Sequence, residues 1–255
     1  MPETPGAEKP KRAIILAAGG GGRLRPLTDD RPKGLLEVAG RAIVEHQIAC
    51  LRWAGMEEIA LVTGHGADKV RERLGDAVTY YHNDRYRETN SLYSAWVARA
   101  FGRRGCLILN SDVLFSPRLL ERLLSAPHGD GLLIDLRADL GEEEMKMMVD
   151  GDGRVRQISK NLDPAQADGE NVGIVRLSRM GAERFFEVGD RMTREHEWNH
   201  WVPFAVDQIC ASHPFFAVST GDIPWIEIDY LHDLKRARES VFPLIHEDLV
   251  QLGLY

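Results

Sequence analysis

The sequence has few of the features that mark secreted, membrane-spanning or disulfide-stabilised proteins. Its only cysteines, Cys50, Cys106 and Cys210, are odd in number and lie within apolar segments, which indicates reduced thiols rather than a disulfide framework. No run approaches the roughly 20 apolar residues of a membrane span, and residues 1–12 lack the apolar core of a signal peptide. We therefore expect a cytoplasmic protein without a membrane partner.

An excess of positive charge is also absent. Lysine and arginine total 32 against 39 acidic residues, which gives a net charge of −7. No basic arm or polybasic run stands out, so a nucleic-acid partner is not expected. The apolar content of 44% and the charged content of 28% are those of a globular chain. For 255 residues we expect a polar, mobile tail over residues 1–12 and a single domain over residues 13–255.

Apolar runs and amphipathic segments alternate through the first half of the chain, which predicts a Rossmann-like, doubly wound α/β fold. Expected strands cover residues 13–18, 59–63, 78–81 and 106–109, with helices over residues 42–54, 68–74 and 91–101 between them. After residue 117 the pattern predicts a helix, a strand over 132–136, a hairpin of 145–149 with 155–158, and a strand over 172–177. Helices near 181–188 and 202–211, a strand over 225–228 and a helix over 230–239 complete the prediction, a mixed sheet with a small β-rich insertion.

The first expected strand leads directly into four glycines, Gly19, Gly20, Gly21 and Gly22, and then Arg23. Glycines allow backbone N–H groups to approach an anion closely, so the pattern suits a phosphate-binding loop, although a simple tight turn has the same composition. No Gly-Lys-Ser/Thr follows, and the spacing is not that of the dinucleotide fingerprint G-x-G-x-x-G. The second strand ends in Thr63 and Gly64 rather than an acidic residue, which also counts against a nicotinamide-dependent dehydrogenase.

The longer stretch ILAAGGGGRLRPLTDDRPKGLLEVAG, residues 15–40, resembles the signature of nucleotidyltransferases that activate sugar phosphates and phospho-alcohols. The resemblance implies that a nucleoside triphosphate lies against Leu16, Ala17, Ala18 and the four glycines. Arg23 would contact its phosphates, and Lys33 would stabilise the reacting α-phosphate. Cationic stabilisation is what this chemistry requires, because charge develops on the phosphate oxygens. The alternative is that both side chains are solvated surface charges.

The same resemblance makes Asp112 and Asp229 the ligands of Mg²⁺, with Ser111 on the nucleotide. Both aspartates directly follow expected strands, where an open α/β sheet binds its ligands. Hard carboxylate oxygens suit Mg²⁺, which takes only one or two protein carboxylates beside a triphosphate. Alternatively, Asp112 is a turn residue and Asp229 caps the helix that follows.

The segment HNDRYRETNSLYSAW, residues 82–96, resembles a narrower branch, the cytidylyltransferases that act on phosphocholine and on small phosphonates such as 2-aminoethylphosphonate. The resemblance places Asn83, Asn90 and Ser91 at the nucleobase. Amide and hydroxyl groups can satisfy the edge of a pyrimidine, but Asn90 stands just before an expected helix and could equally cap it.

Residues 144–160 and 167–178 resemble the acceptor-binding half of that branch. Lys160 matches the lysine that holds the acceptor's phosphate, while Lys146 could meet the acceptor or only solvent. Glu170 and Asn171 lie in a Gly-Glu-Asn-Val-Gly turn. Trp198 and Trp201 would suit an ammonium group through cation–π attraction, or they could simply pack in the core. Residues 13–136 would thus form the nucleotide-binding half and residues 137–255 the acceptor-binding half.

Together these resemblances imply a Mg²⁺-dependent enzyme that joins CTP to a small phosphorylated or phosphonate acceptor and releases pyrophosphate. The acceptor's own anionic oxygen would attack the α-phosphorus, so no protein nucleophile is required. One rival is a sugar 1-phosphate nucleotidyltransferase that uses UTP or another nucleotide. Another is a non-catalytic binding lobe of the same fold, against which the presence of Arg23, Lys33, Asp112 and Asp229 argues. Whether the chain forms a homo-oligomer is left open.

Overall fold

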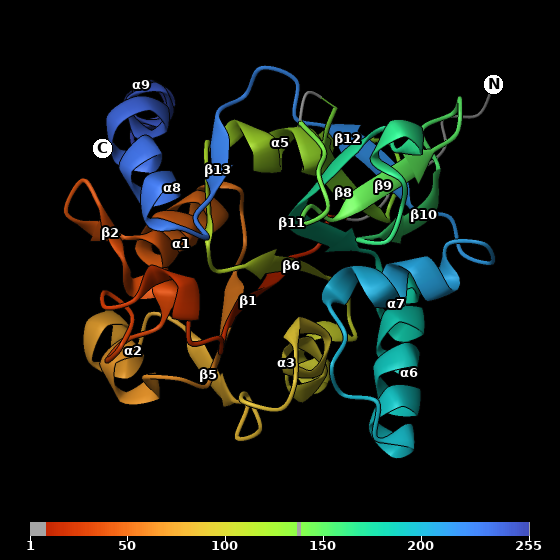
Figure 1. Ribbon diagram of the computed structural model, residues 1–255, viewed down its shortest axis with the longest axis horizontal. Coiled ribbons are helices and arrows are strands. Elements are labelled where there is room, and N and C mark those ends of the chain that lie inside the picture. The colour runs from red at the N-terminus through yellow and green to blue at the C-terminus, as the bar shows by residue number, and fades with distance from the viewer. Residues whose placement is uncertain (1–8, 137–138, 255) are drawn as a thin grey trace.

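The computed structural model describes residues 9–136 and 139–254 of the chain. A twisted mixed sheet forms the middle of the molecule, and helices cover both of its faces (Figure 1). Over the described residues the sheet has nine strands, in the order β10-β9-β11-β6-β1-β4-β5, with β8 beside β11 and β12 beside β8. The strands of the first half are parallel: β1 (Arg12–Ala17), β4 (Glu58–Thr63), β5 (Thr79–His82) and β6 (Cys106–Asn110). The Rossmann-like α/β prediction is confirmed.

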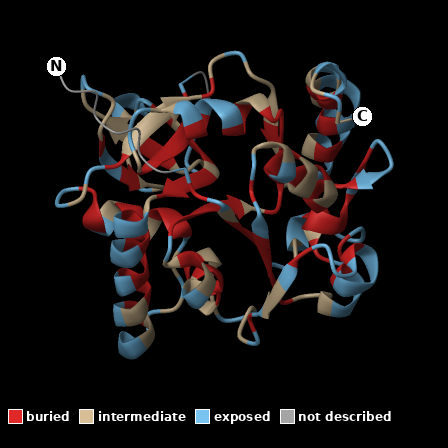
Figure 2. Cartoon of the chain, turned by 180° about the vertical axis from the view of Figure 1, so that it is seen from behind, coloured by how far each residue is buried: buried red, intermediate tan, exposed pale blue. Residues whose placement is uncertain are grey.

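The central strand β1 shows why the sheet lies between two layers of helices. Successive side chains of a strand point to opposite faces, and β1 is apolar on both. Ala13, Ile15 and Ala17 belong to one buried cluster, whereas Ile14 and Leu16 belong to the other. Figure 2 shows the resulting buried centre, with exposed residues on the outer sides of the helices and in the loops.

The helices divide between these two clusters. One cluster contains residues of α1 (Ile43–Trp53), α2 (Ala67–Leu74), α5 (Arg118–Ser125), α8 (Leu231–Arg236) and α9 (Phe242–Gln251). The other contains residues of α3 (Ser91–Val97), α6 (Arg179–Glu195) and α7 (Val202–Ile209), while the short α4 (Arg99–Gly102) contacts β1. The carboxyl ends of the parallel strands stay uncovered by these layers, which is where the site lies.

The second half of the chain extends the same sheet. The predicted hairpin is present as β9 (Lys146–Val149) and β10 (Val155–Ser159), which pair antiparallel. Strand β11 (Gly169–Leu177) runs antiparallel to β6 and also pairs with β9 and with β8 (Gly131–Asp135). The expected β-rich insertion is therefore part of the main sheet rather than a separate layer.

A two-stranded ribbon brings the C-terminal segment to the end of β6. Strand β13 (Trp225–Glu227) pairs antiparallel with β7 (Val113–Phe115), which directly follows the turn after β6. The Ile228 amide donates to the Asp112 carbonyl at 3.0 Å. Residues more than 100 positions apart in the sequence are thus fixed side by side. A second ribbon, β2 (Glu37–Val38) with β3 (Arg41–Ala42), leads into α1.

Several boundaries differ from the sequence predictions. The helix expected over residues 91–101 is interrupted at Ala98, and the helix expected near 181–188 extends over all of α6. Strand β12 (Phe216–Ser219) and helix α9 were not predicted from the sequence. Of the expected mobile tail, residues 1–8 lie outside the described residues, whereas Pro10 is buried and Arg12 already begins β1.

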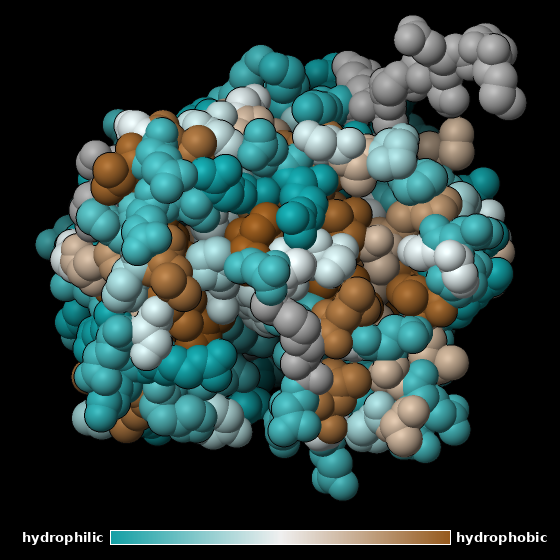
Figure 3. Space-filling view, turned by 90° about the horizontal axis from the view of Figure 1, so that it is seen from above, coloured by the Kyte–Doolittle hydropathy of each residue, from teal (hydrophilic) through white to brown (hydrophobic). Residues whose placement is uncertain are grey.

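The surface agrees with the polar composition of the chain. On the face shown in Figure 3, hydrophilic side chains dominate and apolar ones form separate patches. Within residues 9–136 and 139–254, no helix has both the length and the apolar character required to span a membrane.

Gly173 tests the link between the sheet and the site. It lies at an irregularity between Asn171 and Val175 in β11, with a φ of +81°, and a Cβ there would come within 2.7 Å of the Asn110 amide. Gly173→Ala should therefore lower the free energy of unfolding by roughly 1–3 kcal/mol, the usual range for such backbone strain. Denaturant unfolding measures this. Gly151→Ala, in a turn where a Cβ meets nothing within 4 Å, is the control and should be near neutral; equal effects of the two would contradict the account.

Candidate active site

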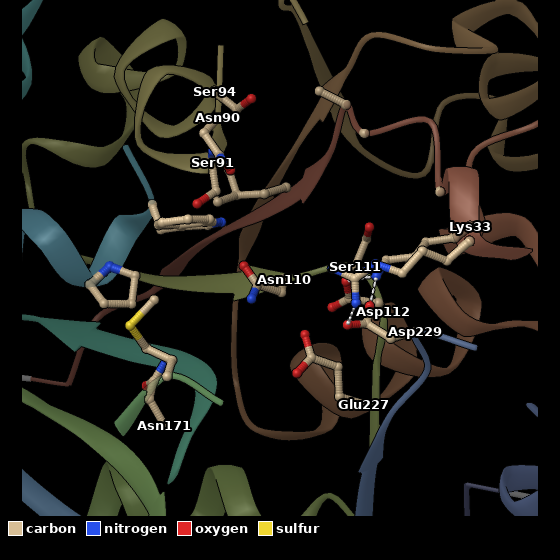
Figure 4. Close-up of a pocket in the computed structure, with 18 of the residues that line it drawn as sticks. Lys33, Asn90, Ser91, Ser94, Asn110, Ser111, Asp112, Asn171, Glu227 and Asp229 are labelled. Carbon is tan, nitrogen blue, oxygen red and sulfur yellow. Dashed lines mark hydrogen bonds and ion pairs between the residues drawn. The ribbon is translucent and has the colours of Figure 1, made fainter. Parts of the chain in front are cut away.

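A cavity of about 370 Å³ opens at the carboxyl ends of β1 and β6. Figure 4 shows its polar lining, with Lys33 and two aspartates on one side and Asn90, Ser91 and Ser94 on the other. Most of the predicted site residues line it: Leu16, Ala18, Gly19, Gly21, Gly22, Arg23, Lys33, Asn90, Ser91, Ser111, Asp112, Lys160, Glu170, Asn171, Trp201 and Asp229. Ala17, Gly20, Asn83, Lys146 and Trp198 are predicted residues that are not among the lining residues.

Lys33 and the two predicted metal ligands form the centre of the cavity. The Lys33 ammonium lies 2.5 Å from Asp112 Oδ2 and 2.5 Å from Asp229 Oδ1. Lys33 begins a short 3₁₀ turn, Lys33–Leu35. The next residue must be glycine for close packing, because a Cβ on Gly34 would lie 2.8 Å from the Val44 side chain. Although burial alone favours the neutral amine, the two carboxylates raise the pKa of Lys33 above its ordinary value.

Arg23 approaches the same aspartate from the glycine loop. Its guanidinium donates to Asp229 Oδ2 at 3.2 Å and to the Tyr230 hydroxyl at 3.1 Å. Burial alone raises the pKa of the Asp229 carboxyl, but Lys33 and Arg23 lower it on balance. The helix-cap alternative for Asp229 is wrong, because Tyr230 is the N-cap residue of α8 and the Asp229 carboxylate instead accepts from Lys33 and Arg23.

Glu227 is a third carboxylate at this centre, and the sequence reasoning missed it. One oxygen from each of Asp112, Glu227 and Asp229 can be chosen so that the three lie within 4.8 Å of one another. Burial, followed by repulsion from Asp112 and Asp229, raises the pKa of Glu227 to about 8. The spacing of Glu227 and Asp229 could have revealed it, because residues two positions apart in an extended segment point to the same face.

These three residues fit a divalent cation of the Mg²⁺ kind. Each offers a hard carboxylate oxygen, the donor that Mg²⁺ prefers. In addition, Asp112 Oδ1 is buried without a hydrogen-bond partner, and a buried acceptor of this kind is costly unless something binds it.

The wall formed by the N-terminus of α3 is the predicted nucleobase side. Asn90 Oδ1 accepts from the Ser91 amide at 2.8 Å, so Asn90 does cap the helix while its side chain also lines the cavity. Asn83 lies behind this wall. It is buried, its amide donates to Thr89 and Ser94, and its oxygen accepts from the Arg85 amide. Asn83 therefore shapes the segment that lines the cavity, and its placement does not support a direct contact with a base.

Most of the predicted acceptor residues line the same cavity. Lys160 Nζ lies 4.0 Å from Glu143 Oε2 and 5.2 Å from the centre of the Trp201 ring. Burial, followed by repulsion from Glu144, Asp135 and Asp229, raises the pKa of Glu170 to about 7.

Two predicted acceptor contacts lie elsewhere. Lys146 is fully buried, and its ammonium donates to the carbonyls of Gly141 and Glu144 at 2.7 and 3.2 Å. Lys146 therefore neither faces the cavity, as an acceptor contact would require, nor points into solvent. Its ammonium instead holds the loop that carries Glu143 and Glu144 to the cavity. Trp198 packs beneath the Arg85 guanidinium, 3.4 Å from the ring centre, outside the cavity lining.

Comparison with known proteins identifies the family. Residues 13–144, more than half of the chain, match the MobA-like NTP transferase domain. The chain belongs to this family. It is 32% identical over 244 residues to a CMP-5'-(3-aminopropyl)phosphonate synthase of Streptomyces rubellomurinus, covering 89% of this chain and 38% of that protein. It is 24% identical to a CTP:phosphoglutamine cytidylyltransferase of Campylobacter jejuni, covering 88% and 97% of the two chains.

The fold also matches solved nucleotidyltransferases. The structure of the inositol-1-phosphate CTP transferase from T. maritima superimposes with a TM-score of 0.78 at 23% identity, covering 95% of this chain and 98% of that one. At this level of identity the match supports the shared fold, and the chemistry rests on the site itself.

The raised pKa of Glu227 gives a prediction for stability in the absence of metal. Its pKa of about 8 in the folded protein exceeds the ordinary 4.5, so between these values the folded state keeps a proton that the unfolded state has lost. Stability must then fall as the pH rises through this window. Glu227→Gln removes this loss, so its melting temperature in EDTA should exceed that of the wild type by a margin that widens from about pH 5 to 8. The exposed Glu187→Gln is the control; a margin independent of pH would contradict the assignment.

Proposed function

We propose that the chain is a Mg²⁺-dependent cytidylyltransferase that joins CTP to a small phosphorylated or phosphonate acceptor and releases pyrophosphate. The observation that carries the proposal is one cavity that brings together two sets of charged groups. The glycine loop, Arg23, Lys33 and three carboxylates line it, and so do Lys160, Trp201 and Glu170. Such a cavity suits two anionic substrates that meet in the middle.

The reaction needs positioning and charge stabilisation rather than a protein nucleophile. The acceptor's anionic oxygen attacks the α-phosphorus in line, the bond to the bridging oxygen breaks, and pyrophosphate leaves. Backbone N–H groups of the glycine loop and Arg23 would hold the triphosphate, and Lys33 would stabilise the charge that grows on the α-phosphate. Asp112 and Asp229, with Glu227 beside them, would hold the cation, which neutralises phosphate charge when bound.

The acceptor side favours a small molecule with an anionic end. Lys160 supplies a positive charge that is paired only loosely with Glu143, at 4.0 Å. Trp201 and Glu170 border the same space. The relative from Streptomyces is named for a phosphonate product and the one from Campylobacter for a phosphoglutamine acceptor, which supports phosphate or phosphonate as the common feature.

The choice of CTP rests on the resemblance of residues 82–96 and on these two relatives. Asn90, Ser91 and Ser94 provide amide and hydroxyl groups on the predicted nucleobase wall. The chain spans only 38% of the Streptomyces relative, so the wider activity of that protein is not transferred to it. We further propose a single domain over residues 13–255, with nucleotide-binding and acceptor-binding halves that meet at this cavity, and a cytoplasmic location.

The direct test is mass spectrometry of products formed from each of CTP, UTP, ATP and GTP with Mg²⁺. The acceptor panel contains phosphocholine, aminoethylphosphonate, aminopropylphosphonate and a sugar 1-phosphate. We expect a CMP-linked product and pyrophosphate with CTP and one of the first three acceptors. Equal or greater turnover of UTP with the sugar phosphate would establish the rival function instead.

Variants show whether the assigned cavity carries that activity. Lys33→Ala should lower kcat about 100-fold or more, the usual cost of losing a group that stabilises transition-state charge. The control is Lys235→Ala, whose side chain is 73% exposed and is not among the residues that line the cavity; this variant should retain wild-type turnover. A Lys33→Ala enzyme with unchanged kcat and only a higher KM for CTP would contradict the role given to Lys33.

A further inference from the structure

The ammonium of Lys33 lies between the two predicted metal ligands, Asp112 and Asp229. Its nitrogen is 2.5 Å from one oxygen of Asp112 and 2.5 Å from one oxygen of Asp229. The same two residues, with Glu227, supply the carboxylate oxygens that lie within 4.8 Å of one another. Figure 4 shows Lys33 reaching over this group, with its ion pairs drawn to both aspartates.

This arrangement leaves the carboxylate cluster incompletely satisfied. Lys33 pairs with Asp112 Oδ2, whereas Asp112 Oδ1 is buried without a hydrogen-bond partner. A divalent cation would serve the cluster better. However, a second cation placed among the same oxygens would lie only a few ångströms from the ammonium, where repulsion between like charges is strong.

We infer that Lys33 and the divalent cation compete for the carboxylates of Asp112 and Asp229, so that cation binding displaces Lys33 into the cavity. The flexible lysine stem allows such a movement. Arg23 shares Asp229 at 3.2 Å, so it too is bound to a carboxylate that the cation would take over. The cation thereby releases the two side chains proposed to hold the phosphates.

A consequence follows for substrate binding. By linkage, a cation that frees Lys33 strengthens nucleotide binding, and the nucleotide strengthens cation binding by the same factor. This step rests on the proposed function for its nucleotide, whereas the competition itself involves only the protein and the cation. An experiment without nucleotide can therefore show that the competition does not occur, independently of whether the proposed nucleotidyl transfer is correct.

The test is isothermal titration calorimetry of the full chain with Mn²⁺ in the absence of nucleotide. Lys33→Met removes the competing ammonium and should bind Mn²⁺ about tenfold more tightly than the wild type, or better. Lys160→Met removes the same charge from the same cavity without touching Asp112 or Asp229, and it reports the effect of net charge alone. Its affinity should change by much less. Weaker or unchanged binding by Lys33→Met, or an equal gain with Lys160→Met, would overturn the inference.

A second measurement avoids any substitution, because Lys33→Met leaves the carboxylates uncompensated and could prevent folding. In the wild-type protein, ¹H–¹⁵N spectra of lysine ammonium groups should contain a protected signal from Lys33 in EDTA. Titration with Mg²⁺ should shift or remove this signal at the cation concentration that saturates binding. A Lys33 signal that stays unchanged while Mg²⁺ binds would show that lysine and cation do not compete, whether or not the protein transfers nucleotides.

Discussion

Three carboxyl groups within a partly buried cavity are the constraint on which the site depends. Asp112, Glu227 and Asp229 repel one another, and the repulsion is strong where little water screens it. The protein offsets part of this cost with Lys33, whose ammonium pairs with both aspartates. The same concentration of negative charge that is unfavourable in the free protein makes the site suited to a divalent cation.

The fold brings these groups together through backbone pairing. Asp112 follows the central strand β6, and the adjacent β7 pairs with β13, which places Glu227 and Asp229 beside it. Lys33 arrives from the other direction on a turn that packs closely only because Gly34 lacks a side chain. Apolar residues on both faces of β1 and β6 fix the sheet between its helical layers. The candidate site therefore lies at the edge of the sheet, at the carboxyl ends of β1 and β6.

Much of the fold and of the candidate site could be predicted from the sequence wherever the residues concerned lie in one continuous stretch. The glycine loop, Arg23 and Lys33 lie within 26 consecutive residues, 15–40. The parallel strands could be predicted because each is an apolar run in the sequence. Positions that depend on tertiary packing could not be predicted in this way. The sequence around Lys146 does not reveal that its ammonium is enclosed by backbone carbonyls, and nothing near Trp198 indicates that Arg85 covers it. Glu227 was overlooked because its partner Asp112 is distant in the chain and meets it only through the β7–β13 ribbon.

At the carboxylate centre, the proposed exchange between Lys33 and a divalent cation links metal binding to nucleotide binding. Its most direct test is a crystal structure of the chain with Mn²⁺ and a non-hydrolysable CTP analogue, in which anomalous scattering locates the metal. We predict Mn²⁺ between Asp112 and Asp229, with the Lys33 ammonium turned away from both aspartates and onto the α-phosphate. A metal bound elsewhere, with Lys33 still paired to Asp112 and Asp229, would contradict it.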